Sequence, residues 1–239
     1  MSRSSQTPAA SPARDPLPLA ASVVVMGRSA VPGEVKTRLQ ARLSPTRAAA
    51  VHAALMRCVL HRLPAWLDAD RFILALDDLG RPEAAGEIPT PWTRMHQGTG
   101  DLGERLDDVW QTIGAGPVVF FGVDSPDVPG VALTELSHKV AADEPDAAAG
   151  PVDDGGYWCL YGRRHQPALL EDIDWGSSQV YDQTRRAAAS AGLNLAPLPP
   201  WHDVDDPDDL DQLRHRIADS SEPALQQLAD DLVKILERD

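Results

Sequence analysis

The sequence predicts an α/β fold with three layers, in which helices cover both faces of a mostly parallel, twisted sheet. Short apolar runs typical of buried strands alternate along the chain with longer segments whose apolar residues recur at helical spacing. Loops rich in Gly, Asp or basic residues follow directly after several of these strands. In open sheets of this kind, ligands bind beyond the carboxyl ends of the strands, so these loops are candidates for one common site.

The first half of the chain supplies four expected strands and two expected helices. Val23, Val24 and Val25 form the centre of the first strand, and the others are similarly short. These strands span residues 22–26, 72–76, 93–97 and 118–121. The helices are recognised by apolar residues that recur at helical spacing, as Val51 and Leu55 do in the first of them. They span residues 45–63 and 102–113.

The second half continues the alternation. Two strands flank an acidic turn and a third strand comes late in the chain. They are expected over residues 147–149, 158–161 and 194–198. Four helices complete the expected architecture. They span residues 130–142, 179–191, 207–217 and 223–236.

The chain of 239 residues is expected to form one domain with two terminal additions. Residues 1–20 are rich in Ser, Pro and Ala without a long apolar core, which indicates a flexible tail instead of a signal peptide. Residues 21–218 form the domain, and residues 219–239 form an amphipathic helix with leucines on one face. We expect this helix to pack against its own domain, with a homodimer contact as the alternative.

The bulk composition limits the partners. A formal net charge of -14 argues against a nucleic acid or an anionic membrane as the main partner. A phosphate site on so acidic a protein needs a local positive pocket or a metal ion. No apolar run reaches the length needed to cross a bilayer. Cys58 and Cys159 lie in different expected elements and are predicted to be buried, reduced thiols of a cytoplasmic protein.

The loop after the first strand is the strongest candidate for phosphate binding. Gly27 and Gly33 allow the backbone to approach an anion, and Arg28, Lys36 and Arg38 supply positive charge. Lys36 is one of only three lysines in the chain. The spacing excludes a P-loop, because five residues separate the two glycines and two more precede the lysine. The alternative is an ordinary surface turn that leads into a helix.

Two acidic segments are candidates for a Mg²⁺ or Mn²⁺ site. Asp124 follows the apolar run 118–121, and residues 203–211 carry six aspartates. Asp206 is a natural N-cap of the helix that starts at residue 207, and the aspartates after it suit the helix dipole. Asp203 and Asp205 precede the cap and gain no such benefit, so they are the better ligand candidates, and which of the two is the ligand stays open.

A third loop, Asp153-Asp154-Gly155-Gly156, lies between two expected strands. Two aspartates followed by two glycines are typical of a tight turn. The functional alternative is a loop whose backbone and carboxylates face a bound acceptor.

Five motifs in this order resemble a bacterial family within the glycosyltransferase A superfamily. They are residues 33–39, 100–105, 124–127, 153–157 and 203–210. The family comprises transferases associated with radical-SAM or selenodomain proteins and is linked by name to arsenosugar glycosyl transfer. The resemblance spans residues 22–215 and implies the nucleotide-diphospho-sugar transferase fold. The chain is also similar, more distantly, to nucleotidyltransferases that include the guanylyltransferase acting on phospholactate.

The resemblance implies roles for particular residues. Those expected at the donor nucleotide are Gly27, Arg28, Gly33, Lys36, Arg38, Gln97, Gly98 and Asp101. The metal is expected on Asp124 and Asp205, with Asp203 as the further candidate. The acceptor is expected near Asp153, Asp154, Gly155 and Gly156. The chain departs from the family at Met26-Gly27-Arg28, where Phe-Ala-Lys is usual, and at residues 175–178, where Trp-Ser-Thr-Ser is usual.

Together these features predict a metal-dependent transferase that uses a nucleotide-activated donor and a small-molecule acceptor. Glycosyl transfer from a nucleotide-sugar is the leading hypothesis. Lys36 and Arg38 would then stabilise the departing diphosphate, and Asp153 or Asp154 would orient or deprotonate the acceptor. The alternatives are nucleotidyl transfer from a nucleoside triphosphate to a phosphorylated small molecule, and a non-catalytic nucleotide-binding module.

Overall fold

The computed structural model describes residues 15–80, 87–114, 116–142 and 144–237. The first strand, β1, begins at Leu17, so the last residues of the expected tail belong to the sheet. Residues 1–14 of that tail lie outside the described residues. No helix among the described residues is long and apolar enough to cross a membrane. Cys58 and Cys159 are buried and free, as predicted.

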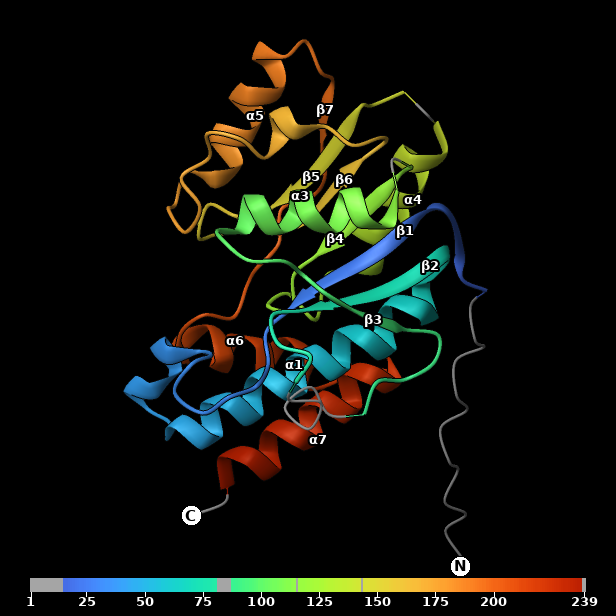
Figure 1. Ribbon diagram of the computed structural model, residues 1–239. Coiled ribbons are helices and arrows are strands. Elements are labelled where there is room, and N and C mark those ends of the chain that lie inside the picture. The colour runs from blue at the N-terminus through green and yellow to red at the C-terminus, as the bar shows by residue number, and fades with distance from the viewer. Residues whose placement is uncertain (1–14, 81–86, 115, 143, 238–239) are drawn as a thin grey trace, which may run out of the picture.

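The core of the molecule is a mixed sheet of seven strands in the order β3-β2-β1-β4-β6-β5-β7 (Figure 1). The strands are β1 (Leu17–Gly27), β2 (Leu67–Leu76), β3 (Thr93–His96), β4 (Val118–Phe121), β5 (Ala147–Pro151), β6 (Tyr157–Gly162) and β7 (Leu195–Pro197). Only β6 runs against the others, because it pairs antiparallel with both β4 and β5. The mostly parallel sheet predicted from the sequence is therefore confirmed.

Helices cover both faces of the sheet and form a further layer on one side (Figure 1). The α-helices are α1 (Pro45–Trp66), α3 (Leu102–Ile113), α4 (Gly130–Ala142), α5 (Val180–Ser190), α6 (Pro207–Ile217) and α7 (Pro223–Glu237). Two 3-10 helices, which the sequence did not predict, are η1 (Thr37–Ala41) and η2 (Pro167–Leu169).

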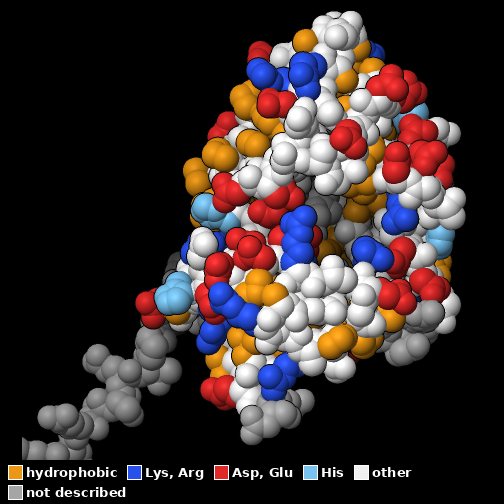
Figure 2. All heavy atoms as spheres, turned by 90° about the vertical axis from the view of Figure 1, so that its left-hand side faces the viewer, with side chains coloured by type: hydrophobic (Ala, Val, Ile, Leu, Met, Phe, Trp, Pro, Cys, Tyr) orange, Lys and Arg blue, Asp and Glu red, His pale blue; other side chains and the backbone are white. Residues whose placement is uncertain are grey.

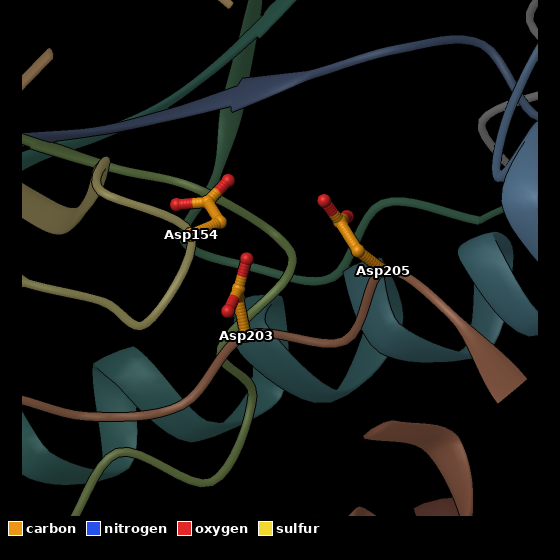
Figure 3. A group of neighbouring side chains, drawn as sticks. All are labelled: Asp154, Asp203 and Asp205. Carbon is orange, nitrogen blue, oxygen red and sulfur yellow. The ribbon is translucent and has the colours of Figure 1, made fainter. Parts of the chain in front are cut away.

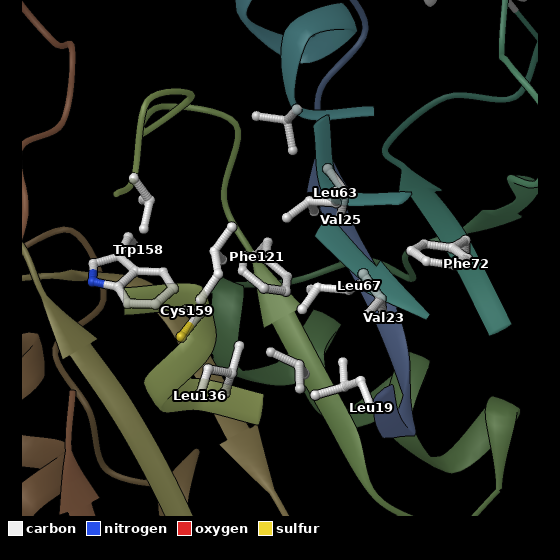
Figure 4. Packing of buried hydrophobic residues seen from close by; sticks show 14 of the residues in the cluster. Leu19, Val23, Val25, Leu63, Leu67, Phe72, Phe121, Leu136, Trp158 and Cys159 are labelled. Atoms are coloured by element: carbon white, nitrogen blue, oxygen red, sulfur yellow. The ribbon is translucent and has the colours of Figure 1, made fainter. Parts of the chain in front are cut away.

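Alternation along β1 divides the core between the two faces of the sheet. Val23 and Val25 pack with α1 and α4, in the cluster that Figure 4 shows, whereas Val24 packs with α3 and α5 on the opposite face. This follows from the two-residue side-chain period of a strand. A third cluster joins the outer side of α1 to α6 and α7. Leu225, Leu228 and Leu232 of α7 are buried there, so this helix packs against its own domain, as the sequence predicted.

The parallel strands all end at one edge of the sheet. β1, β2, β3, β4 and β5 end at Gly27, Leu76, His96, Phe121 and Pro151, and the loops that follow hold the polar residues singled out in the sequence. β6 enters at this same edge because it runs antiparallel. The topology thus brings together loops that are more than a hundred residues apart in the chain.

Candidate functional site

The loop after β1 is fixed at its start by the loop after β2. The Ser29 amide donates a hydrogen bond to Asp77 Oδ1 at 2.7 Å, and Arg28 Nε lies 3.5 Å from Asp77 Oδ2. Partial burial raises the pKa of Asp77, but hydrogen bonds from Ser29 and Arg28 outweigh it and hold the pKa below its usual value. On the other side, His52 Nε2 lies 2.9 Å from the Arg28 carbonyl oxygen. Neither Asp77 nor His52 was predicted from the sequence as part of the site.

The same loop ends on Lys36, which is buried between two carboxylates. Lys36 adopts the left-handed conformation, with φ of 46°. Its Nζ lies 2.7 Å from Asp124 Oδ1 and 3.0 Å from Asp205 Oδ1, and its side chain is only 6% exposed. Burial alone would lower the pKa of Lys36, but the charges of Asp124 and Asp205 outweigh it and raise the pKa above its ordinary value. The ammonium group thus balances the negative charges of Asp124 and Asp205, two of the predicted metal ligands.

Backbone contacts join the loop after β4 to residues 203–205. The Val204 amide donates to the Asp124 carbonyl oxygen at 2.9 Å, and Lys36 Nζ donates to the Val204 carbonyl oxygen at 2.6 Å. Val204 itself is fully buried. These bonds hold Asp124 and Asp205 at a fixed spacing around Lys36, which the sequence could not show because the three segments are far apart in the chain.

Asp203 and Asp205 meet Asp154 from the β5–β6 loop (Figure 3). Each of the three residues has a carboxylate oxygen within 4.8 Å of the others. Asp203 is 9% exposed, and its burial, together with the charges of Asp154 and Asp205, raises its pKa to about 7. Three carboxylates gathered in this way, with the pKa of Asp203 raised, form a candidate cation site. Asp124 is not a member of this group and is connected to it through Lys36.

The turn before β6 holds Asp154 in place. Asp154 Oδ1 accepts a hydrogen bond from the Gly156 amide at 2.7 Å. Gly155 has φ of +88°, and a Cβ atom there would lie 2.0 Å from the Ser178 carbonyl oxygen, so a glycine is required. Asp153 contacts His202, a residue that the sequence analysis did not single out. The tight-turn interpretation of this segment is therefore confirmed.

Three of the residues expected at the donor nucleotide have structural roles in the local backbone, namely Gln97, Gly98 and Asp101. Gln97 is buried, and its Nε2 donates to the Gly27 carbonyl oxygen at 3.2 Å. Gly98 has φ of +81°, and a Cβ atom there would lie 2.2 Å from Asp108 Oδ2. Asp101 is the N-cap of α3 and forms a capping box with Glu104. Helix capping thus gives the Asp101 carboxylate a structural role, and its contact with a nucleotide, which the resemblance implies, stays a prediction.

Two of the predicted basic residues stay exposed at the site. The Arg28 side chain is 55% exposed and the Arg38 side chain 70% exposed, although Arg38 Nη1 lies 3.1 Å from Asp205 Oδ2. Gly33 has φ of +88° with open space where a side chain would stand. Figure 2 looks onto this side of the molecule and shows acidic and basic side chains gathered around a hollow.

The fold and these loops define a class of protein, the nucleotide-diphospho-sugar transferase fold. A putative nucleotide-diphospho-sugar transferase from Desulfovibrio desulfuricans G20 superimposes with a TM-score of 0.74 and 28% sequence identity. The match covers 91% of this chain and 97% of that one. An inositol-1-phosphate CTP transferase from T. maritima shares the fold with a TM-score of 0.52 at 12% identity, covering 92% of this chain and 97% of that one.

A further structure with the same fold is a 4-diphosphocytidyl-2C-methyl-D-erythritol synthase, with a TM-score of 0.54 at 11% identity. That match covers 82% of this chain and 97% of the synthase chain. Residues 59–177 match the model of the family described as "Uncharacterized protein conserved in bacteria (DUF2064)". No curated protein matches the sequence.

Proposed function

We propose that the protein is a metal-dependent transferase that uses a nucleotide-activated donor. The observation that carries the proposal is the group of Asp154, Asp203 and Asp205, whose carboxylate oxygens lie within 4.8 Å of one another. The group stands at the edge where the parallel strands end, which is where open sheets bind their ligands. The fold shared with nucleotide-using transferases supports the same conclusion.

The residues present fit a divalent cation. Carboxylate oxygens are the ligands that Mg²⁺ and Mn²⁺ prefer. Two carboxylates about 4 Å apart repel by roughly 4 kcal/mol at an effective dielectric constant near 20. Burial is the main cause of the raised pKa of Asp203, and repulsion from Asp154 and Asp205 adds to it. A bound cation would remove this repulsion between the carboxylates. Asp203 and Asp205 were predicted as ligands from the sequence, and we propose Asp154 as their partner instead of the predicted Asp124.

Binding of the donor, positioning of Asp205 and binding of the acceptor are proposed roles of the protein's own residues. A bound divalent cation would neutralise charge on the donor's phosphate groups. Arg28 and Arg38 are exposed beside the site, and guanidinium groups pair with phosphate oxygens in a bidentate manner. Lys36 keeps Asp205 in position through its contact at 3.0 Å. The acceptor is proposed to bind beside the turn of residues 153–156.

Glycosyl transfer from a nucleotide-sugar is the reaction that we favour. Support comes from the Desulfovibrio structure, which bears the name of a putative nucleotide-diphospho-sugar transferase and aligns over nearly its whole length. Nucleotidyl transfer from a nucleoside triphosphate is the second candidate. It is favoured by the basic loop directly after β1, because the exposed guanidinium groups of Arg28 and Arg38 can pair with the longer phosphate chain of a triphosphate.

Product analysis separates the two reactions. The protein is incubated with Mn²⁺ and a mixture of small-molecule acceptors, together with either nucleotide-sugars or nucleoside triphosphates. Release of a nucleoside diphosphate from a nucleotide-sugar supports glycosyl transfer. Pyrophosphate release that occurs only from a triphosphate would contradict glycosyl transfer and would indicate nucleotidyl transfer. Binding of nucleotides without turnover of either donor would indicate that the protein is a non-catalytic nucleotide-binding module.

Asp154→Asn tests the metal assignment within the same assay. Asparagine keeps an oxygen that can accept from the Gly156 amide, so the turn is retained while the charge is lost. We expect turnover to fall at least tenfold and the Mn²⁺ requirement to shift to higher concentration. Asp68→Asn is the matched control, because Asp68 is exposed at the start of β2, at the opposite edge of the sheet. Equal effects of the two variants would contradict the assignment.

A further inference from the structure

His202 and Asp153 form a contact between the two loops that carry the carboxylate group. His202 Nδ1 lies 2.5 Å from Asp153 Oδ2. Each partner is the direct chain neighbour of a member of the group, since Asp153 precedes Asp154 and His202 precedes Asp203. The contact therefore lies one residue away from the acidic cluster on both sides.

We propose that the His202–Asp153 pair is a clip that positions Asp154 against Asp203 and Asp205 for cation binding. The inference rests on the proposed function, because it assigns a purpose to a spacing that matters only if a cation binds there. His202 is here a positioning residue that acts through its neighbours. His202 is outside the set of residues to which the sequence resemblance gave a role, whereas Asp153 was expected near the acceptor.

Contacts of the neighbouring residue Trp201 fix the position from which the His202 side chain reaches Asp153. The Trp201 amide donates to the Pro151 carbonyl oxygen at 2.9 Å, and Trp201 forms a bridge with Val152. The Trp201 indole donates to Asp127 Oδ1 at 3.2 Å, and its ring centroid lies 5.1 Å from that of His202. Backbone and indole thus fix the base of the His202 side chain, and the imidazole extends the connection to Asp153.

The physical need for such a clip follows from charge. Asp154 and Asp203 repel one another, and the repulsion contributes to the raised pKa of Asp203. Without a cation, this repulsion favours separation of the loops. A hydrogen bond from the imidazole to Asp153 opposes the separation, so less of the binding energy of a cation is spent on bringing the loops together. Groups that hydrogen-bond directly to metal ligands typically change metal affinity by about 10–100-fold, and the clip, which acts one residue away, should act at the lower end of that range.

A positioning role and a simple electrostatic role of His202 predict opposite changes in cation affinity when the side chain is removed. If His202 acted only as a nearby positive charge, its removal would make the site more negative and would strengthen cation binding. A positioning role predicts weaker binding instead. The two side chains are 43% and 73% exposed, so their loss should leave the folded state intact.

Mn²⁺ titration of the full chain, followed by calorimetry or by the EPR signal of free Mn²⁺, tests the clip. We expect His202→Ala to raise the Kd for Mn²⁺ about tenfold while Tm changes by less than about 2 °C. His202→Asn should stay within about threefold of the native Kd, because its amide can donate from a position close to that of Nδ1. In a background of Asp153→Ala, the further change His202→Ala should have little effect.

His165→Ala is the matched control. His165 Nε2 lies 2.5 Å from Asp107 Oδ1, so the chain contains a second His–Asp pair of the same length. It follows β6, whose last residue pairs with the first residue of β4, at the edge of the sheet opposite the site. This variant should bind Mn²⁺ with native affinity.

The outcomes separate the clip from the function on which it rests. If the native protein does not bind Mn²⁺, the metal-dependent function is wrong and the clip has no purpose. If the native protein binds Mn²⁺ and His202→Ala binds it equally or more tightly, the clip is wrong and the metal site stands. An affinity loss in His165→Ala as large as that in His202→Ala would also refute the clip.

Discussion

At the scale of single residues, Lys36 has the most unusual environment. It is a buried ammonium group with two carboxylates and a carbonyl oxygen around it. Removing one partner of a buried charge group leaves the others uncompensated, which typically costs about 3–5 kcal/mol. The sequence marked Lys36 as a phosphate ligand, but it could not show these contacts, because the loops that supply them join only through the sheet topology.

We therefore predict that Lys36→Met lowers Tm by about 10 °C at pH 8, since 1 kcal/mol corresponds to roughly 2–4 °C for a chain of this size. Arg38→Ala serves as the comparison, because Arg38 contacts Asp205 from an exposed position where an ion pair contributes less than about 1 kcal/mol. Thermal melting checks both variants. Equal Tm values for the two would show that Lys36 does not compensate the carboxylates.

Asp203 leads to a prediction on pH. Its pKa of about 7 in the folded chain lies above the ordinary value of 3.8, so the folded state holds this proton more tightly than the unfolded state. Stability linked to this group is thus lost as the pH rises from about 4 through 7. Asp203→Asn should raise Tm by about 3 °C or more at pH 8, and by less at pH 5.

The same variant should lose its stabilisation by Mn²⁺, because a ligand is removed. Melting curves at the two pH values, with EDTA and with Mn²⁺, separate the effects. A variant that is less stable than the native protein at pH 8 in EDTA would contradict the account of Asp203.

At the scale of elements, the turn of residues 153–156 depends on the glycine at 155. A Cβ atom there would meet the Ser178 carbonyl oxygen at 2.0 Å, in addition to the penalty of a positive φ. Gly155→Ala is expected to cost more than about 3 kcal/mol and to weaken Mn²⁺ binding, because Asp154 stands on the same turn.

Gly176→Ala is the control for that prediction. Gly176 has φ of +92° and open space where a side chain would stand, so only the backbone penalty of about 1–2 kcal/mol applies. Urea unfolding of both variants measures the difference. If the two variants lose the same stability, steric contact with Ser178 plays no part.

Most elements could be predicted from the sequence, and the misses have physical causes. The helices 102–113, 130–142 and 207–217 and the strand 118–121 match the structure at both ends. β1 starts earlier than expected because its first residues include Pro18 and alternate between exposed and buried, which is not typical of a buried central strand. β2 starts earlier because its first residues are mostly charged and partly exposed. The N-cap Asp206 was predicted, because capping is local. His202 was not, because its partner lies 49 residues away.

At the scale of the whole molecule, α7 completes the core on the outer side of α1. Its leucines Leu225, Leu228 and Leu232 are buried there, and Glu222 before the helix forms an ion pair at 2.6 Å with Arg62, whose side chain is buried. We predict that deletion of residues 219–239 costs roughly 5 kcal/mol or more, since each buried leucine contributes about 1.5–3 kcal/mol. Soluble yield and urea unfolding check this. A truncated chain with native stability would show that the segment is an independent addition.

For the molecule as a whole, we expect nucleotide binding to depend on a divalent cation at Asp154, Asp203 and Asp205. Thermal shift with a panel of nucleoside di- and triphosphates, in Mn²⁺ and in EDTA, tests it most directly. We predict that at least one nucleotide, at a hundredfold excess over its Kd, raises Tm by about 5 °C or more in Mn²⁺. The shift should disappear in EDTA and in Asp154→Asn. No shift with any nucleotide, or an equal shift in EDTA, would contradict the account.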